Sequence, residues 1–179
     1  MITHPTETMD SVTQSEYGVV YPQDDHNQKL VDNVHPSSWV NPEPRDRYNI
    51  VVVGAGTAGL VTAVIAAGVG AKVALIERHL VGGDCLNVGC VPSKGILRAA
   101  RAWADLRNSG EFGLHIPPGV KYDFGGAMTR MRKLRARISH TDSVHRYTKL
   151  GVDVYIGSAR FTDGDTIQVE GQAGNRTLR

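Results

Sequence analysis

Residues 49–59 read NIVVVGAGTAG, a β-branched run followed directly by three closely spaced glycines. The run predicts a short, central strand of a parallel sheet, buried on both faces. The apolar stretch 60–67 predicts a helix that ends at glycines 68 and 70, and residues 72–77 predict a second strand. The order strand, glycine loop, helix, strand is typical of an α/β protein with a parallel sheet.

The glycine loop, residues 54–59 (GAGTAG), has the pattern G-x-G-x-x-G between the predicted strand and helix. At such a junction the backbone N–H groups of the helix start can hold a pyrophosphate. Gly54 permits the tight turn, Gly56 lets the backbone approach the phosphates, and Gly59 lets the helix pack closely on the strand. The loop therefore predicts a Rossmann-like nucleotide site.

Glu77 lies at the end of the second predicted strand, 23 positions after Gly54. Its carboxylate can accept hydrogen bonds from the ribose hydroxyls of an adenosine. The unit does not separate FAD from NAD, because both contain ADP. The alternative is a glycine-rich turn of some other α/β protein, with Glu77 merely at a strand end.

Residues 50–71 are uncharged over a length that could span a bilayer. Five glycines divide this stretch into strand, turn and helix, and the valine run favours a sheet. We therefore expect a buried crossover and no membrane segment.

The 179 residues contain 41% hydrophobic and 21% charged side chains, an ordinary globular balance. The net charge of +2 divides into −5 for residues 1–47 and +7 for the rest. A positive balance of this size suits an anionic ligand but is too weak and scattered to indicate nucleic acid. The polar first 30 residues show no secretory signal, so a cytoplasmic protein is expected.

Residues 1–47 hold five of the eight prolines and show no sustained period, so a mostly irregular acidic extension is predicted. Apolar residues such as Leu30, Val31 and Trp39 leave open whether short pieces of it dock on the folded body. Residues 48–179 are predicted to form the globular part.

Two longer helices are predicted beyond residue 90. Residues 93–108 carry an apolar side, and residues 124–150 form a helix that Gly151 ends. In the second helix, basic residues fill the gaps of the apolar stripe and favour a solvated face over a nucleic-acid surface. The apolar stripe comprises Met128, Met131, Leu134 and Ile138. The basic cluster comprises Arg130, Arg132, Lys133, Arg135 and Arg137. Further strands are predicted over 152–156 and 166–169, with a turn at 163–165.

The two cysteines, Cys85 and Cys90, lie in the segment 82–94, GGDCLNVGCVPSK. We expect them near the start of one helix and within disulfide reach, roughly 4.4 to 6.8 Å between Cα atoms. A helix N-terminus stabilises a thiolate and so promotes thiol–disulfide exchange. A structural disulfide closing so short a loop would contribute little stability, and a zinc site completed by His79 or His115 lacks a second ligand pair. Exchange chemistry is therefore favoured, and no metal site is predicted.

The segment GGDCLNVGCVPSK closely resembles the redox-active segment of class I pyridine nucleotide disulfide oxidoreductases. The sequence VGGDCLNVGCVPSK is most similar to mercuric-reductase-like members of this family, which also includes dihydrolipoamide dehydrogenase. The resemblance spans residues 48–179. It implies that Cys85 exchanges with substrate, Cys90 faces the flavin of FAD, and Lys94 lies near the flavin ring. The residues it assigns to FAD are Gly54, Gly56, Gly59, Glu77, Gly83 and Lys94.

The resemblance also implies a reaction. Electrons would pass from NAD(P)H through FAD to the cysteines and then to a small-molecule disulfide or a metal ion, in a homodimer. The nicotinamide domain and the dimer interface of this family would lie beyond Arg179, so we expect a truncated form, its FAD-binding domain incomplete at the C-terminus and inactive alone. The alternative is a non-catalytic nucleotide-binding or interaction fragment. A simple NAD-binding domain would leave the cysteines unexplained.

Two residues depart from the family pattern. Asp84 stands where many relatives have threonine, and Gly95 where many have alanine. Asp84 places a possible negative charge beside Cys85, where it opposes the effect of the helix start on that thiol. Neither departure removes the chemistry.

Overall fold

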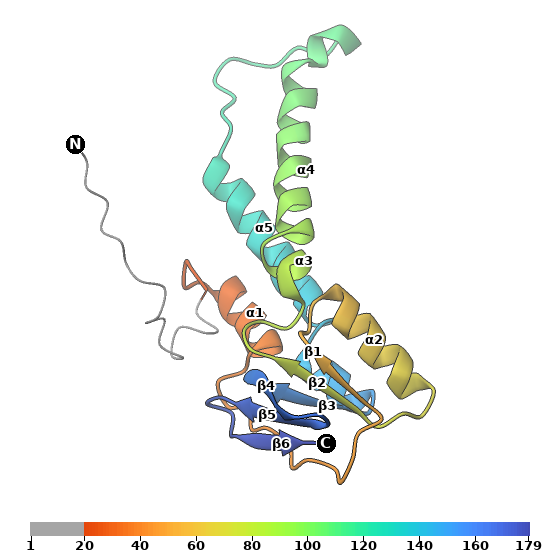
Figure 1. Cartoon of the computed structure of the whole chain (residues 1–179). Helices are drawn as coiled ribbons and strands as arrows, with labels where there is room; N and C mark the ends of the chain where they lie inside the picture. Colours follow the sequence, from red (N-terminus) through yellow and green to blue (C-terminus); the bar gives the residue numbers. More distant parts are fainter. Residues whose placement is uncertain (1–19) are drawn as a thin grey trace, which may run out of the picture.

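The structure is a computed structural model that describes residues 20–179 (Figure 1). Its centre is a parallel sheet in the order β1 (Ile50–Val53), β2 (Val73–Glu77), β3 (Val152–Ile156). The helix α2 (Thr57–Gly68) connects the first two strands. The predicted strand–loop–helix–strand unit and the α/β fold class are thereby confirmed, with boundaries shifted by a few residues at most.

The prediction that the first strand is central and buried on both faces is wrong. β1 is an edge strand of the three-stranded sheet, and Val53 at its end is exposed. The central strand is β2, because β3 pairs with its other side. Within residues 20–179 no strand pairs with the outer edge of β1. A β-branched run indicates a strand that suits burial, but the number of neighbouring strands depends on segments distant in sequence.

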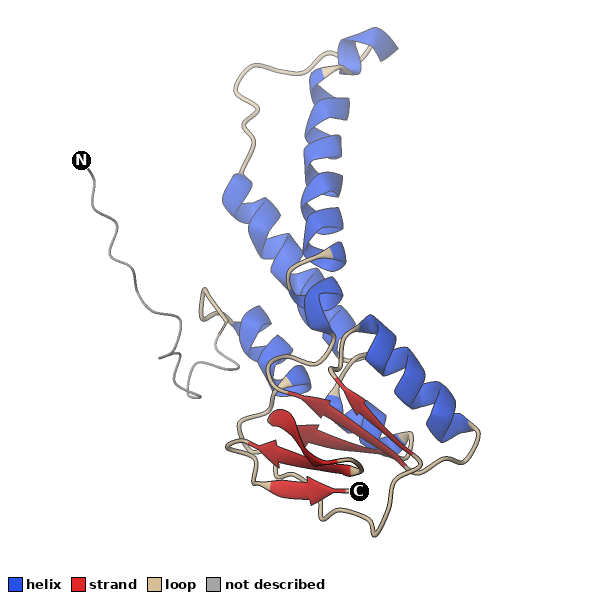
Figure 2. Cartoon of the chain, in the orientation of Figure 1, coloured by secondary structure: helices blue, strands red, loops and turns tan. Residues whose placement is uncertain are grey.

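A second sheet is antiparallel and consists of β4 (Ser158–Asp163), β5 (Thr166–Glu170) and β6 (Arg176–Leu178). The predicted strand at 166–169 and the turn before it are confirmed by β5 and the β4–β5 turn, whereas β4 and β6 were not predicted. This sheet lies against one face of the parallel sheet, as Figure 2 shows.

β2 is buried on both faces and separates two apolar clusters. Val73 and Leu75 pack with α2 and other helices, while Ala74 and Ile76 pack against the antiparallel sheet. Because side chains alternate along a strand, Glu77 shares the helical face with Leu75. The position of the acid near the glycine loop therefore follows from the strand register.

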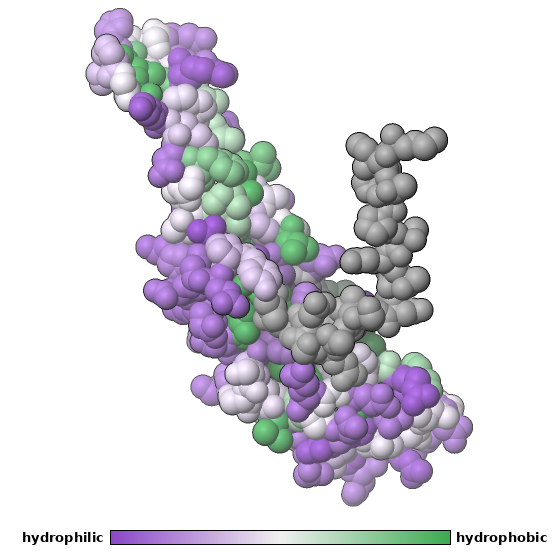
Figure 3. Space-filling view, turned by 90° about the vertical axis from the view of Figure 1, so that its left-hand side faces the viewer, coloured by the Kyte–Doolittle hydropathy of each residue, from purple (hydrophilic) through white to green (hydrophobic). Residues whose placement is uncertain are grey.

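The helices after β2 are α3 (Gly83–Asn87), α4 (Cys90–Arg107), α5 (Phe124–Ser139) and α6 (Val144–Lys149), with a short 3-10 helix η2 (Ser109–Phe112). Figure 2 shows α4 and α5 projecting from the sheets as a hairpin. Figure 3 shows hydrophobic residues at the surface of this hairpin. The exposed hydrophobic side chains of the two helices include Leu97 and Phe124. The helix predicted over 93–108 is confirmed by α4, which begins three residues earlier.

The predicted helix 124–150 is in fact two helices. The chain turns at residues 140–143, and Ser143 caps α6 by accepting a hydrogen bond from the Arg146 N–H. The segment Thr141-Asp142-Ser143 is a turn and N-cap signal that identifies this break. Ile138, expected in the apolar stripe, is 37% exposed because Arg135 and Ala136 occupy the inner face instead.

The interpretation of the basic cluster as a solvated face is wrong for two of its members. Arg135 is 8% exposed, and Arg132 is largely covered and paired with Asp24. Arg130, Lys133 and Arg137 are exposed, as predicted. The buried arginines face a helix whose presence the α5 sequence does not reveal.

That helix is α1 (Asp25–Val34), capped by the Asp24 side chain, which accepts a hydrogen bond from the Asn27 N–H. Leu30 and Val34 are fully buried in the cluster that also holds β2. For residues 20–47 the structure thus shows docking on the folded body. The prediction for residues 1–19 lies outside the described residues. Among residues 20–179 no helix is both long and apolar enough to cross a membrane.

Candidate active site

The glycine loop turns directly from β1 into α2. Gly54 has φ +97°, a conformation that side chains disfavour, and its N–H donates to the Ile76 carbonyl. A Cβ on Gly59 would lie 1.9 Å from the Gly54 carbonyl oxygen, so no side chain fits there. Gly56 is the N-cap of α2, and no side chain caps its N–H groups. These groups are available to an anion at the helix start.

The Glu77 carboxylate is held beside the loop. One oxygen accepts the Ala55 N–H at 2.7 Å, and the other accepts the His79 N–H at 2.9 Å. An ionised carboxylate has about four acceptor positions, so each oxygen can accept a further donor. Glu77 therefore lies on the same side of the sheet as the loop, where a ribose would bind.

The cysteine segment is attached to the glycine loop by backbone contacts. The Gly82 N–H donates to the Ala55 carbonyl at 2.8 Å. A Cβ on Gly83 would approach the Gly56 Cα to 2.6 Å, whereas a Cβ on Gly56 would meet no atom closer than 4.0 Å. Gly83 is thus required by packing against the loop, while open space remains over Gly56. That space suits a phosphate.

One groove joins these parts. It is lined by the glycine loop, by Val52 and Val53 of β1, by Thr62 of α2, and by Asp84 and Cys85. Since the groove contains both the helix start and a thiol, a ligand bound at the loop lies next to the cysteine segment. Cys85 lines this groove and Cys90 does not.

The two cysteines lie on separate helices, which corrects the prediction of a single helix. Cys85 is in α3, and Cys90 is the first residue of α4. The chain turns between them because the Val88 and Gly89 N–H groups both donate to the Asp84 carbonyl. A Cβ on Gly89 would lie 2.8 Å from that carbonyl oxygen, so the turn requires glycine.

Both cysteines are free thiols, Cys85 half-buried and Cys90 exposed. A hydrogen bond with Cys85 and the charge of a Cys85 thiolate raise the pKa of Cys90, and the charge of Lys94 opposes this rise. The direction of this shift reflects the proximity of the two thiols. Their spacing relative to disulfide reach stays a prediction. Lys94 is exposed one helical turn after Cys90.

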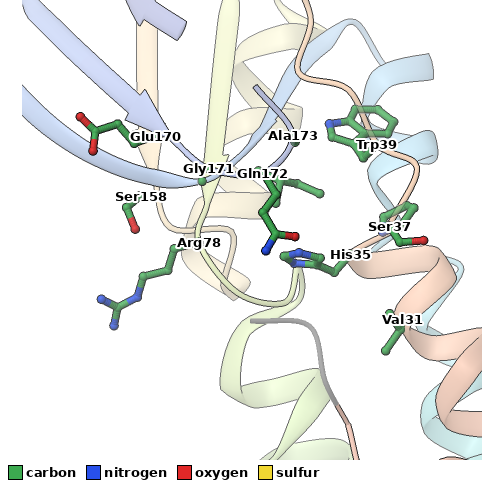
Figure 4. Close-up of a pocket in the computed structure, with 13 residues that line it drawn as sticks. Val31, His35, Ser37, Trp39, Arg78, Ser158, Glu170, Gly171, Gln172 and Ala173 are labelled. Carbon is green, nitrogen blue, oxygen red and sulfur yellow. The ribbon is translucent and has the colours of Figure 1, made fainter. Parts of the chain in front are cut away.

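A second pocket opens at the carboxyl ends of β2 and β3. Its wall includes Arg78, which follows Glu77, Gly157, which follows β3, and Ser158, the first residue of β4. Figure 4 shows His35 and Trp39, from the segment after α1, on the same pocket. The sequence suggested only that Trp39 could dock on the folded body, and no local pattern assigns His35 or Trp39 to a pocket. Ligands of open parallel sheets bind at this edge.

His35 also connects the N-terminal segment to the strand-end loop. Its Nδ1 contacts the His79 carbonyl oxygen. Burial lowers the pKa of His79, and the nearby Glu77 carboxylate counters this. The contact between His35 and His79 thus holds the segment after α1 against the loop that follows β2.

The described residues contain no group of three or more His, Cys, Asp or Glu side chains that could hold a metal ion. The site does fit the ADP half of a dinucleotide. An uncapped helix start, open space over Gly56 and a carboxylate with free acceptor positions line up beside a pocket at the strand ends.

The fold and the site are those of an α/β nucleotide-binding domain that carries two cysteines beside its glycine loop. Residues 48–176 match the family model of pyridine nucleotide-disulphide oxidoreductases, and the chain belongs to this family. Members of the family use FAD and NAD(P)H.

The chain is similar to two kinds of characterised relative. It is 35% identical to the dihydrolipoyl dehydrogenase of Acholeplasma laidlawii, over 70% of this chain and 37% of the relative. It is 34% identical to the mercuric reductase of Lysinibacillus sphaericus, over 70% of this chain and 23% of the relative. The chain thus spans well under half the length of these relatives.

Solved structures agree with this assignment. The chain matches the HOCl-induced flavoprotein disulfide reductase RclA from Escherichia coli, in its Cu(II) complex, with a TM-score of 0.61 and 27% identity. The match covers 75% of this chain and 27% of the other. The shared fold therefore covers more of the chain than the glycine loop and the cysteine segment alone.

Proposed function

We propose that this polypeptide is the FAD- and dithiol-bearing part of an oxidoreductase that passes electrons from NAD(P)H to a disulfide or metal-ion substrate. The observation that carries the proposal is the single groove lined by the glycine loop and Cys85. Cys85 lies 31 positions after Gly54, the first glycine of the loop. The two motifs are nevertheless in direct contact, because Gly83 packs on Gly56. This arrangement supports a nucleotide and an exchanging thiol at one site.

Within this proposal the glycine loop and α2 start bind the pyrophosphate, and Glu77 accepts the ribose hydroxyls. The strand-end pocket with Arg78 and Gly157 receives the adenine. FAD would supply two-electron transfer from the nicotinamide to the cysteine pair. Lys94, whose charge favours a thiolate on Cys90, is assigned to the flavin side of the pair.

The cysteines then carry the exchange. Cys85 attacks the substrate disulfide, which forms a mixed disulfide and releases one substrate thiol. Cys90 attacks the Cys85 sulfur, which releases the second thiol and leaves a Cys85–Cys90 disulfide. A soft metal ion is the other substrate class, since two thiolates bind soft cations well. Relatives named mercuric reductase, and the Cu(II) complex of RclA, support including it.

A thiol-exchange assay tests this assignment. The reduced chain is mixed with the chromogenic disulfide 5,5′-dithiobis(2-nitrobenzoate), and released thiol and protein mass are measured. The wild-type chain is expected to release two equivalents and carry no adduct, because the second thiol resolves the first mixed disulfide. Cys85→Ser and Cys90→Ser should each release one equivalent and retain one adduct. Adducts on both cysteines of the wild-type chain would contradict a dithiol function.

A further inference from the structure

The buried guanidinium of Arg135 lies between three helices. One Nη donates to the Asn87 carbonyl oxygen at 2.6 Å, and the other donates to Asn27 Oδ1 at 2.6 Å. Asn87 lies between the two cysteines at the end of α3, and Asn27 belongs to α1. One side chain of α5 thus connects the N-terminal helix to the loop that carries the thiols.

Burying the Arg135 guanidinium at this position carries a cost in folding free energy. Arg135 is 8% exposed, and among residues 20–179 no carboxylate lies within salt-bridge distance of it. Its Nε and the Asn87 Oδ1 are buried without hydrogen-bond partners within that part of the chain. Burial lowers the pKa of Arg135, and the like charge of Arg132 lowers it further. A buried cation without an anion is a weak source of stability.

The contact fits a positioning role better. The Asn87 side chain donates to the carbonyls of Gly83, Val81 and Leu80, so its amide already ties the loop to the segment before α3. Arg135 takes the Asn87 main-chain carbonyl, which the five-residue helix α3 leaves without a helical partner. Together these bonds hold both the side chain and the main-chain carbonyl of Asn87, which lies between Cys85 and Cys90.

We propose that Arg135 is a positioning residue that holds the Cys85–Cys90 loop in the conformation from which its disulfide closes, with Asn27 of α1 holding the guanidinium. The inference rests on the proposed dithiol function. The inference also assigns a role to α1, which lies before the segment 48–176 that matches the family. When the loop is fixed in advance, less conformational entropy is lost as the disulfide forms. Removing Arg135 should therefore shift the pair toward the dithiol.

The test is a redox titration of the full chain in glutathione buffers at pH about 7. The pair reduces one oxidised glutathione, forming the Cys85–Cys90 bond and two reduced glutathione molecules, and alkylation with mass spectrometry gives the oxidised fraction. Arg135→Met should lower the oxidation equilibrium constant about tenfold, the size of effect expected from one lost charged hydrogen bond. Arg135→Lys, which keeps the charge and one donor, should give a smaller decrease of about threefold.

Arg132→Met is the matched control. Arg132 lies one turn earlier on α5 and binds Asp24 and Thr129 without contacting the cysteine segment. We expect its constant to stay within about twofold of wild type. Equal constants for the Arg132 variant and a folded Arg135 variant, Met or Lys, would overturn the inference while leaving the dithiol function intact. A wild-type chain that forms no Cys85–Cys90 disulfide at any glutathione ratio would contradict the proposed function, and the inference with it.

Discussion

The nucleotide half of the site and the thiol half are built in different ways. Around β1, α2 and β2 the deciding contacts are between backbones. Gly59 and Gly83 allow approaches that any side chain would block, and Gly54 adopts a φ of +97° that side chains disfavour. Around the cysteines the deciding contacts are long polar side chains, as when Arg135 joins residues 48 and 108 positions away. The nucleotide half depends on the lack of a Cβ at its glycines, and the thiol half depends on the hydrogen bonds of its polar side chains. They should therefore respond differently to substitution.

The largest effect is expected at Gly59. Gly59→Ala should cost about 3 kcal/mol of unfolding free energy or more, because the new Cβ would lie 1.9 Å from a backbone oxygen that no rotamer change can move. Gly68→Ala, in the last turn of the same helix with nothing within 4 Å, should be neutral or stabilising by up to about 1 kcal/mol. Urea unfolding followed by circular dichroism measures both. Equal stability of the two variants would show that α2 can move away from β1.

A smaller effect is expected at Glu77, and on binding more than on folding. Glu77→Gln should weaken binding of ADP about tenfold, because an amide presents one acceptor fewer and turns its N–H₂ toward the N–H of Ala55 or His79. Isothermal titration calorimetry with ADP gives the dissociation constants. Glu111→Gln on η2, far along the chain from the loop, is the control and should leave ADP binding unchanged. An unaffected Glu77→Gln variant would contradict the ribose assignment.

The smallest effect is expected at Asp24, in the polar half. Burial raises its pKa, but the Asn27 N–H, the hydrogen bond from Arg132 and the charge of Arg132 together lower it below the ordinary 3.8. A lowered pKa means that the stabilisation is present above about 3.8 and is lost as the pH falls through the folded-state pKa. Asp24→Asn retains an N-cap and removes only the charge. It should cost less than about 1 kcal/mol near neutral pH, because the carboxylate is partly solvated.

That prediction is checked by urea midpoints of both chains at several pH values. The difference between wild type and Asp24→Asn should shrink as the pH falls through the lowered folded-state pKa of Asp24. A difference that is constant with pH would mean that the charge of Asp24 contributes nothing to holding α1 against α5.

Much of the nucleotide half was predictable because its signals are local. The run IVVV, the glycines after it and Glu77 at the next strand end all act within 28 residues, 50–77, and the structure confirms the strands and the crossover helix. The edge position of β1 was not predictable, because pairing partners come from elsewhere in the chain. The break before Ser143 and the cap at Asp24 carried local signals that a closer reading of turn residues identifies.

By itself, the sequence determined the family, the glycine loop and the spacing of Cys85 and Cys90, because steric requirements and motif chemistry act between near neighbours in the chain. Only the tertiary structure decided that Arg135 is buried while Lys133 is exposed, although both are basic residues on one helix. Whether a charge is buried depends on the partners that surround it. Here those partners, Asn27 and Asn87, come from distant segments that only the folded chain brings together.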